Sequence, residues 1–148
     1  MKLTNSSNLF PSYLMGGFEC SYSLTKDRTR LDLLSSTKHD VYCQEDYQLL
    51  KELNIQTVRE GLKWVEIDKG NNEYDFSRFE KMMQIAKEEG IKQIWDLNHY
   101  DFPERLDPFT NAFITQFAEY GKRVIETIRR YQTVVLFLSL FFHIRQIG

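Results

Sequence analysis

The segment KQIWDLNHYDFP, from Lys92 to Pro103, gives the clearest indication of the fold. It begins with a short apolar run, Ile94 to Leu97, and continues into polar and aromatic residues, a pattern typical of a buried strand that ends in a loop. In α/β proteins, ligands bind at the carboxyl ends of parallel strands. The polar side chains that follow this run, Asn98 and His99, are therefore candidates for a binding site.

Further strand-like segments occur along the chain at a regular interval. They begin near Leu14, Ile55, Lys92 and Thr133, about 40 residues apart, which is somewhat longer than the roughly 30 residues per unit of a typical βα barrel. A helix-like segment separates each strand from the next. This alternation predicts parallel strands joined by helical crossovers.

Three segments carry apolar residues at helical spacing and are predicted as helices: residues 43–53, 76–89 and 108–130. Asn54 and Gly90 are expected to end the first and second helices, because both residue types tolerate the left-handed conformation of a helix C-terminus. Asp107 is expected to cap the third helix, with Pro108 as its first residue.

The order of elements fits two α/β architectures, a barrel and a doubly wound sheet. A doubly wound nucleotide-binding sheet would carry a glycine-rich phosphate loop after its first strand, but Gly16 and Gly17 fall within the predicted strand and form no G-x-G-x-x-G motif. The pattern therefore favours a (β/α)8 TIM barrel.

The composition is that of one ordinary globular domain, and it narrows the classes of partner. The chain has 148 residues, a net charge of -2 and 42% hydrophobic residues, with no basic stripe, so we expect no nucleic-acid partner. The most apolar segment, residues 134–142, is about half the length of a membrane span, so no membrane partner is expected. Cys20 and Cys43 lack the spacing of a zinc motif, and we expect neither a metal nor another cofactor. The sequence predicts a cytoplasmic protein that binds a neutral ligand such as a sugar.

Polar and aromatic residues follow three of the predicted strands: Glu19, Arg59, Trp64, Asn98 and His99. A neutral imidazole donates to and accepts from sugar hydroxyls, a guanidinium holds a carboxylate, and an indole stacks on the apolar face of a pyranose. Each residue also has a purely structural alternative, since Arg59 could cap a helix and Trp64 could pack under a loop. The grouping of these residues after successive strands favours a shared binding site.

Two of these segments resemble motifs of family 1 glycoside hydrolases. TVREGLKW is similar to the second-strand motif, in which an Arg is followed five residues later by a Trp, here Arg59 and Trp64. DLNHYDFP resembles the third-strand motif, a leucine followed by His-aromatic-Asp-x-Pro, here Leu97 and His99 to Pro103. The resemblance implies the N-terminal portion, about four strands, of the barrel of family 1 or a related clan.

This resemblance also implies roles for the matched residues. His99 would bind a hydroxyl of the sugar in the innermost subsite, and Arg59 would lie beside the catalytic nucleophile and keep it ionised. Trp64, Asn98 and Glu19 would complete the site, although no motif supports Glu19. The expected partner is a carbohydrate or glycoside.

The two glutamates with which these enzymes hydrolyse O-glycosidic bonds have no counterpart in the chain. The family's acid/base lies in an Asn-Glu-Pro motif after the fourth strand and its nucleophile near the seventh, whereas this sequence has no Asp or Glu after Glu126. We therefore assign no catalytic residue and expect residues 1–148 to be one truncated glycosidase-like barrel domain, with an aberrant or frame-shifted tail over 133–148. The isolated chain is expected to be inactive, and the alternative is a non-catalytic remnant, a sugar-binding module or an assembly module that self-associates through exposed strand edges.

Overall fold

A computed structural model describes residues 10–100, 102–131, 134–136 and 140–141. Four parallel strands form its central sheet: β1 (Gly16–Gly17), β4 (Thr57–Gly61), β7 (Lys92–Asp96) and β9 (Val134–Leu136), in the order β1-β4-β7-β9. Sequential strands are therefore neighbours. The alternation of strands and helices that the sequence predicts is confirmed.

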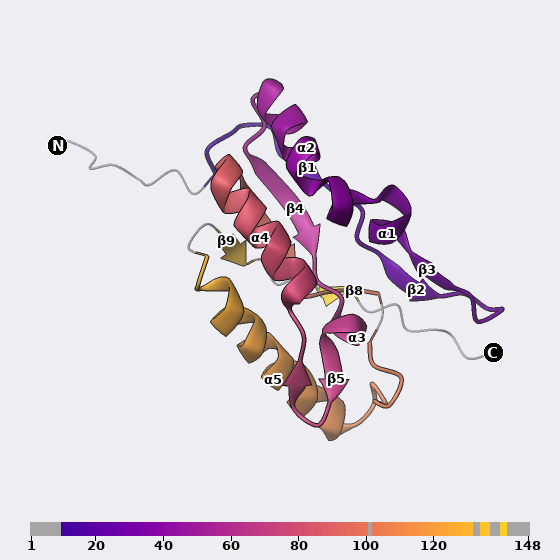
Figure 1. Ribbon diagram of the computed structural model, residues 1–148. Helices are drawn as coiled ribbons and strands as arrows, with labels where there is room; N and C mark the ends of the chain where they lie inside the picture. The colour runs from indigo at the N-terminus through magenta and orange to yellow at the C-terminus, as the bar shows by residue number, and fades with distance from the viewer. Residues whose placement is uncertain (1–9, 101, 132–133, 137–139, 142–148) are drawn as a thin grey trace.

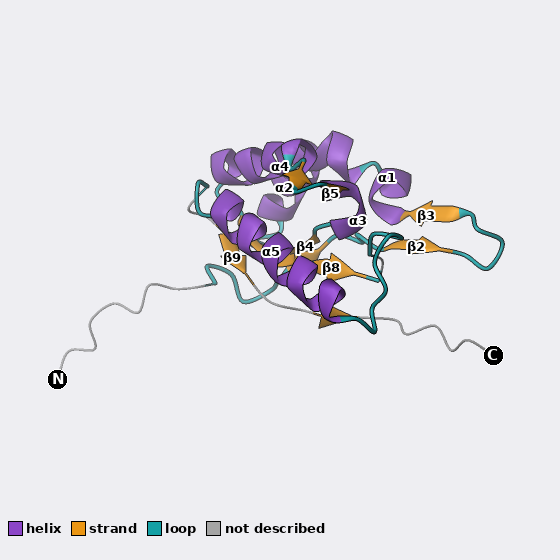
Figure 2. Cartoon of the chain, turned by 90° about the horizontal axis from the view of Figure 1, so that it is seen from below, coloured by secondary structure: helices purple, strands orange, loops and turns teal. Residues whose placement is uncertain are grey.

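Three long helices connect these strands and cover one face of the sheet: α2 (His39–Glu52), α4 (Ser77–Glu89) and α5 (Asn111–Ile128). Figure 1 shows them side by side in front of the strands, and Figure 2 shows the helix layer above the strand layer. A parallel pair requires a crossover, and a helical crossover places the helix against the sheet. In the part of the chain that the structure describes, none of the helices is both long and apolar enough to cross a bilayer.

Shorter elements fill the connections, and the sequence predicted none of them: β2 (Tyr22–Leu24) with β3 (Arg30–Asp32), α1 (Leu33–Thr37), α3 (Trp64–Ile67), β5 (Asp68–Gly70) with β6 (Glu73–Tyr74), and β8 (Asn98–His99) with β10 (Leu140–Phe141). The β2–β3 and β5–β6 pairs are antiparallel hairpins, whereas β8 and β10 run parallel. The predicted aberrant segment 133–148 lies mostly outside the described residues, and its described parts are β9 and β10.

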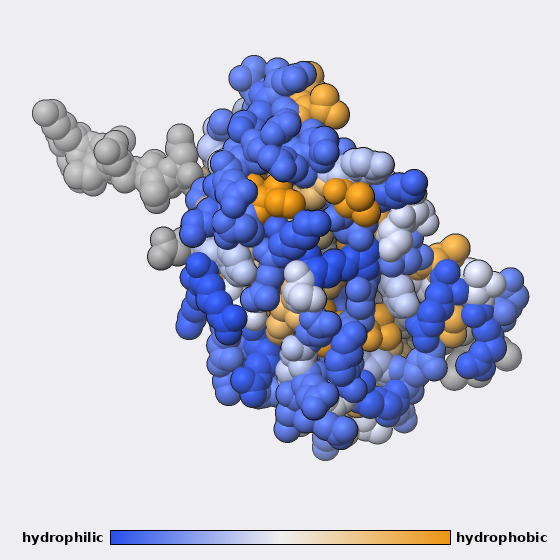
Figure 3. All heavy atoms as spheres, viewed as in Figure 1, coloured by the Kyte–Doolittle hydropathy of each residue, from blue (hydrophilic) through white to orange (hydrophobic). Residues whose placement is uncertain are grey.

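The hydrophobic core lies between the sheet and the helix layer. Val58 and Trp95 point from their strands into this core, and Trp95 meets Phe79 of α4 edge-on with ring centroids 6.1 Å apart. Met83 and Tyr120 are fully buried beside them. Burying one such side chain contributes about 1.5–3 kcal/mol, so this layer is the main source of stability. The outward face of the helices is largely hydrophilic with small separate apolar patches, as Figure 3 shows.

The ends of the helices confirm two of the sequence predictions and correct a third. Asn54 and Gly90 follow α2 and α4 in left-handed conformation, with φ of 57° and 71°. Helix α5, however, begins at Asn111 and is capped by Thr110, so the prediction that Asp107 caps it with Pro108 as its first residue is wrong. The Asp107 side chain instead accepts a hydrogen bond from the Phe109 amide in the preceding turn (3.0 Å), because a short acidic side chain readily closes such a local turn.

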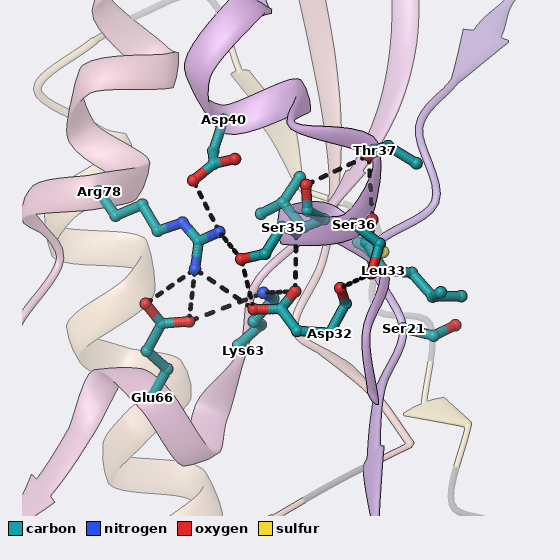
Figure 4. Close-up of polar contacts among 12 residues, drawn as sticks. Ser21, Asp32, Leu33, Ser35, Ser36, Thr37, Asp40, Lys63, Glu66 and Arg78 are labelled. Atoms are coloured by element: carbon teal, nitrogen blue, oxygen red, sulfur yellow. Dashed lines mark hydrogen bonds and ion pairs between the residues drawn. The ribbon is translucent and has the colours of Figure 1, made fainter. Parts of the chain in front are cut away.

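An ion-pair network ties the end of β3 and the start of α2 to α3 and α4 (Figure 4). Lys63 is almost fully buried and pairs with Asp32, which also accepts a hydrogen bond from the backbone at the start of α1. Arg78 of α4 reaches Glu66 at 2.9 Å and Asp40 at 2.8 Å. The network holds the connection after β3 against the rest of the fold.

Candidate functional site

The site is built on the face of the sheet that the helices leave uncovered. Along β4 and β7, Glu60 and Gln93 point toward the helix layer, where both contact Tyr47 of α2. Because successive strand residues face opposite sides, Arg59 and Asp96 point the other way. Arg59 and Asp96 form an ion pair on that face.

The residues that follow β1 lie beside His99, near the ends of β4 and β7. The Nδ1 atom of His99 lies 3.3 Å from Cys20 Sγ, 3.4 Å from Ser21 Oγ and 3.7 Å from Glu19 Oε1. Cys20 and His99 are 79 residues apart in sequence. The parallel sheet brings them together, because the carboxyl ends of its strands share one edge.

Gly61 explains how the segment after β1 comes so close to β4. The Phe18 amide donates to the Arg59 carbonyl (3.0 Å), which directs the following residues over the end of β4. A Cβ atom at Gly61 would lie only 2.1 Å from Cys20 Sγ. The missing side chain therefore makes room for the Cys20 sulfur.

The environment sets the charge of the groups at this site. Burial, together with the Arg59 cation, lowers the pKa of His99 despite the opposing effect of Glu19 and Asp96, so its imidazole is neutral at pH 7. Burial raises the pKa of the Cys20 thiol to about 12, against a smaller opposing effect of Arg59, so Cys20 is protonated. The hydrogen bond from Ser21 is the main reason why the pKa of Glu19 is lowered, and its carboxylate is ionised.

The solvent-facing part of the site differs from what the sequence predicts. Glu19 and Arg59 side chains are 48% and 42% exposed, whereas His99 is buried. Tyr100 is 40% exposed and stacks on His99 with ring centroids 4.4 Å apart. Its φ of 82° is uncommon for a residue other than glycine. Sequence reasoning missed Tyr100 as a site residue, although its place directly after His99 was the available signal.

The prediction that Trp64 faces a sugar is wrong. Trp64 lies in α3, has no solvent exposure and stacks on Tyr120 of α5 with ring centroids 5.5 Å apart. Its indole Nε1 donates to Asp68 Oδ2 at 3.0 Å. The chain turns into α3 immediately after β4, which carries the indole away from the sheet end and under α5.

Asp96 and Asn98 are two further polar residues, at the end of β7 and in β8. Asn98 is 2% exposed, and within the described residues its Nδ2 atom has no hydrogen-bond partner, so its contact with a ligand stays a prediction. The sequence analysis did not name Asp96 as a site residue. The alternation of strand side chains could have placed it, because Asp96 lies two residues after Ile94 and therefore on the same face of β7. Cys20 was also missed, because its neighbours come from distant segments.

A separate groove lies on the helix side of the molecule. It has a volume of about 540 Å³ and is lined mainly by Leu97 and by residues of α5, among them Phe117, Gly121 and Ile125. Its lining is largely apolar and includes none of the residues around His99. The groove is therefore not the candidate site.

Comparisons with known proteins point to glycosidases over part of the chain. The chain is 28% identical to beta-glucosidase 31 of Arabidopsis thaliana over 94 residues, which are 60% of this chain and 16% of that protein. It superposes on a β-glucosidase from Exiguobacterium marinum with a TM-score of 0.60, at 24% identity over 68% of this chain and 24% of the other. An exo-β-1,4-mannosidase from Opitutaceae bacterium strain TAV5 gives a TM-score of 0.64, at 15% identity over 81% of this chain and 27% of the other. No family model matches the sequence.

These likenesses establish the fold and a partial resemblance. The chain aligns with the N-terminal quarter of TIM-barrel glycosidases, and it is similar over that part to family 1 β-glucosidases and family 5 relatives. It spans about a quarter of the length of the similar structures, and less of the curated relative. The predicted α/β barrel portion is confirmed.

Proposed function

We propose that the carboxyl end of the sheet binds a β-linked carbohydrate, as one wall of a glycosidase-type barrel. The observation that carries this proposal is the convergence of Arg59, His99 and Glu19 on one sheet edge, from segments far apart in sequence. The similar proteins named above are two β-glucosidases and an exo-β-1,4-mannosidase, which supports a β-linked sugar as the ligand class.

Each exposed group has a suitable role in sugar binding. The Glu19 carboxylate accepts hydrogen bonds from sugar hydroxyls, and the Arg59 guanidinium donates to them. Tyr100 offers an exposed aromatic surface on which a pyranose ring can stack, the role that Trp64 was expected to have. His99 is buried beneath this surface, and we propose that it orients Tyr100 and contacts a hydroxyl only at the edge of the site.

Hydrolysis of O-glycosidic bonds is proposed for the complete barrel and not for this chain alone. Retaining glycosidases use two carboxyl groups about 5–5.5 Å apart, one as acid/base and one as nucleophile. At this face, Asp96 is engaged by Arg59, and Glu19 is held by Ser21. For this chain alone, the alternative is a sugar-binding module that does not hydrolyse its ligand. The engagement of both carboxylates favours this alternative, because neither is available as an acid/base or a nucleophile.

Ligand-observed saturation-transfer NMR tests the binding proposal. Methyl β-D-glucopyranoside and methyl β-D-mannopyranoside are added separately to the purified chain, since the two sugars differ only in the configuration of one hydroxyl. We expect saturation transfer to at least one sugar, and its loss in Tyr100→Ala. Tyr42→Ala is the matched control, because Tyr42 is 50% exposed and belongs to α2, on the helix side of the sheet.

Two outcomes would contradict the proposal: no transfer to either sugar, or equal transfer in the wild type and in Tyr100→Ala. A cytoplasmic location and self-association through sheet edges stay predictions.

A further inference from the structure

Three side chains of different chemistry meet at one point beside the sheet edge. One ligand atom each from Glu19, Cys20 and His99 lies within 4.8 Å of the other two. A carboxylate, a thiol and an imidazole are the three kinds of protein group that bind zinc. We propose that these residues form a zinc-binding site with three protein ligands.

Two of the three ligand-atom distances are close to those around a tetrahedral metal, and the third, between Cys20 Sγ and the Glu19 carboxylate, is at most 4.8 Å. Zinc binds sulfur at about 2.3 Å and nitrogen or oxygen at about 2.0–2.2 Å, so neighbouring ligand atoms around a tetrahedral ion lie roughly 3.3–3.6 Å apart. Cys20 Sγ and His99 Nδ1 are 3.3 Å apart, and His99 Nδ1 and Glu19 Oε1 are 3.7 Å apart. A small rotation of the half-exposed Glu19 side chain closes the remaining difference.

The donor set favours zinc over magnesium or calcium. Hard cations prefer oxygen ligands alone, whereas thiolate and imidazole select zinc among the abundant divalent ions. On binding, the Cys20 thiol loses its proton to solvent, and the thiolate and the Glu19 carboxylate together neutralise the two charges of the ion. The Arg59 cation nearby is already paired with Asp96, which reduces its repulsion of the metal.

The fold holds two of the ligands in place before any metal arrives. Cys20 is 1% exposed and sits in the space that Gly61 leaves, and His99 is buried in β8, whose backbone pairs with β10. Glu19 lies at the solvent boundary and leaves the fourth position open to water. Three protein ligands and one open position are the arrangement of a zinc site that can also accept an exogenous ligand.

This site shares Glu19 and His99 with the sugar proposal, but its readout is separate, because the metal depends on Cys20 and the sugar on Tyr100. Tyr100 and Arg59 ligate no metal, so Tyr100→Ala is expected to lose the sugar and keep the zinc. Conversely, a chain that binds no sugar can still bind zinc through Cys20. The two proposals therefore fail separately.

Cobalt substitution tests the site in the full chain. We expect Co²⁺ to give an intense near-ultraviolet thiolate-to-cobalt absorption band and visible bands typical of tetrahedral cobalt, and Zn²⁺ to remove both at one equivalent. Cys20→Ser is expected to abolish the near-ultraviolet band. Cys43→Ser is the matched control and should keep the band, because Cys43 is a second buried free cysteine on the opposite, helix side of the sheet.

A second variant separates metal binding from folding. Glu19 is half-exposed, so Glu19→Gln should fold normally and bind Zn²⁺ at least about tenfold more weakly, a loss that even outer-shell changes produce in metal sites. The proposal is overturned if the wild type shows no thiolate-to-cobalt band, if Cys20→Ser keeps it, or if Glu19→Gln binds Zn²⁺ as tightly as the wild type.

Discussion

At the level of single residues, Gly61 has the tightest surroundings among the glycines of the described chain. A Cβ atom there would lie 2.1 Å from Cys20 Sγ and 2.8 Å from Cys20 Cβ, and Cys20 is itself enclosed. Gly121 in α5 is the opposite case, since its Cβ would meet Leu97 at an ordinary 3.8 Å. The two positions form a natural pair for substitution.

We predict that Gly61→Ala lowers the free energy of unfolding by about 1–3 kcal/mol, the usual cost of overpacking a closed site. Gly121→Ala is expected to raise it by up to about 1 kcal/mol, because alanine is the better helix former and has room. Urea denaturation of both variants measures the difference. Equal stability of Gly61→Ala and the wild type would show that Cys20 does not occupy this space.

A buried charged network also acts at the level of residues. His39 lies under Phe18 and contacts Asp46 through Nδ1 (2.6 Å) and Glu60 through Nε2 (3.1 Å). Burial alone would lower the pKa of His39, but hydrogen bonds to Cys43, Glu60 and Asp46, with the charge of Glu60, raise it from 6.5 to about 10. His39 is therefore protonated in the folded protein at neutral pH.

This pKa difference predicts how stability changes with pH. Between pH 6.5 and about 10 the folded state binds the His39 proton and the unfolded state has released it, so the free energy of unfolding falls as pH rises through this range. The contribution is fully present below pH 6.5. We expect denaturation curves at pH 6, 8 and 9.5 to show this fall in the wild type and a weaker fall in His39→Gln. The same slope in both proteins would assign the effect to another group.

At the level of elements, the chain uses specific residues to end its helices. Helix α2 ends where Asn54 takes a φ of 57°, and there the Asn54 amide donates to the Lys51 carbonyl (2.9 Å). The Ile55 amide then reaches back to the Leu50 carbonyl at 2.9 Å. These bonds satisfy carbonyls at the helix end and direct the chain into β4.

We predict that Asn54→Ala lowers the free energy of unfolding by roughly 1 kcal/mol, since a Cβ-bearing residue without a short polar side chain is disfavoured in this conformation. Asn54→Gly is expected to be neutral or stabilising, because glycine adopts positive φ without steric cost. Thermal denaturation of the two variants tests the pair. An alanine variant as stable as the glycine variant would mean that the helix end does not depend on this conformation.

At the level of the whole molecule, a parallel sheet covered by helices on one face presents its ligand-facing residues on the other. Arg59, Asp96 and the segment from Glu19 to Ser21 all lie on that second face or at its edge. In a barrel this face is the interior. The arrangement supports binding, whereas hydrolysis requires a pair of carboxyl groups that are both available.

We predict that the purified chain does not hydrolyse aryl β-glucosides or aryl β-mannosides above the rate without protein. Removing groups that act as a unit in catalysis eliminates most of the rate enhancement, and here both nearby carboxylates are already engaged. Release of the aryl group is followed by absorbance. Turnover that persists through purification and disappears in Glu19→Gln would show that Glu19 is catalytic.

The sequence by itself determined the order of strands and helices, the C-terminal ends of α2 and α4, and the strand edge at which Arg59 and His99 lie. These features follow from local periodicity and from single residues such as Asn54 and Gly90, whose preferences act within a few positions. The placements of Trp64, Cys20 and Tyr100 were decided only by the tertiary structure. Trp64 is buried because the chain turns into α3 after β4, where the indole packs on Tyr120 of α5. Cys20 contacts His99 because the parallel sheet brings distant segments of the chain together. Packing between elements of large sequence separation leaves no local pattern, and for that reason these three placements became visible only in the folded chain.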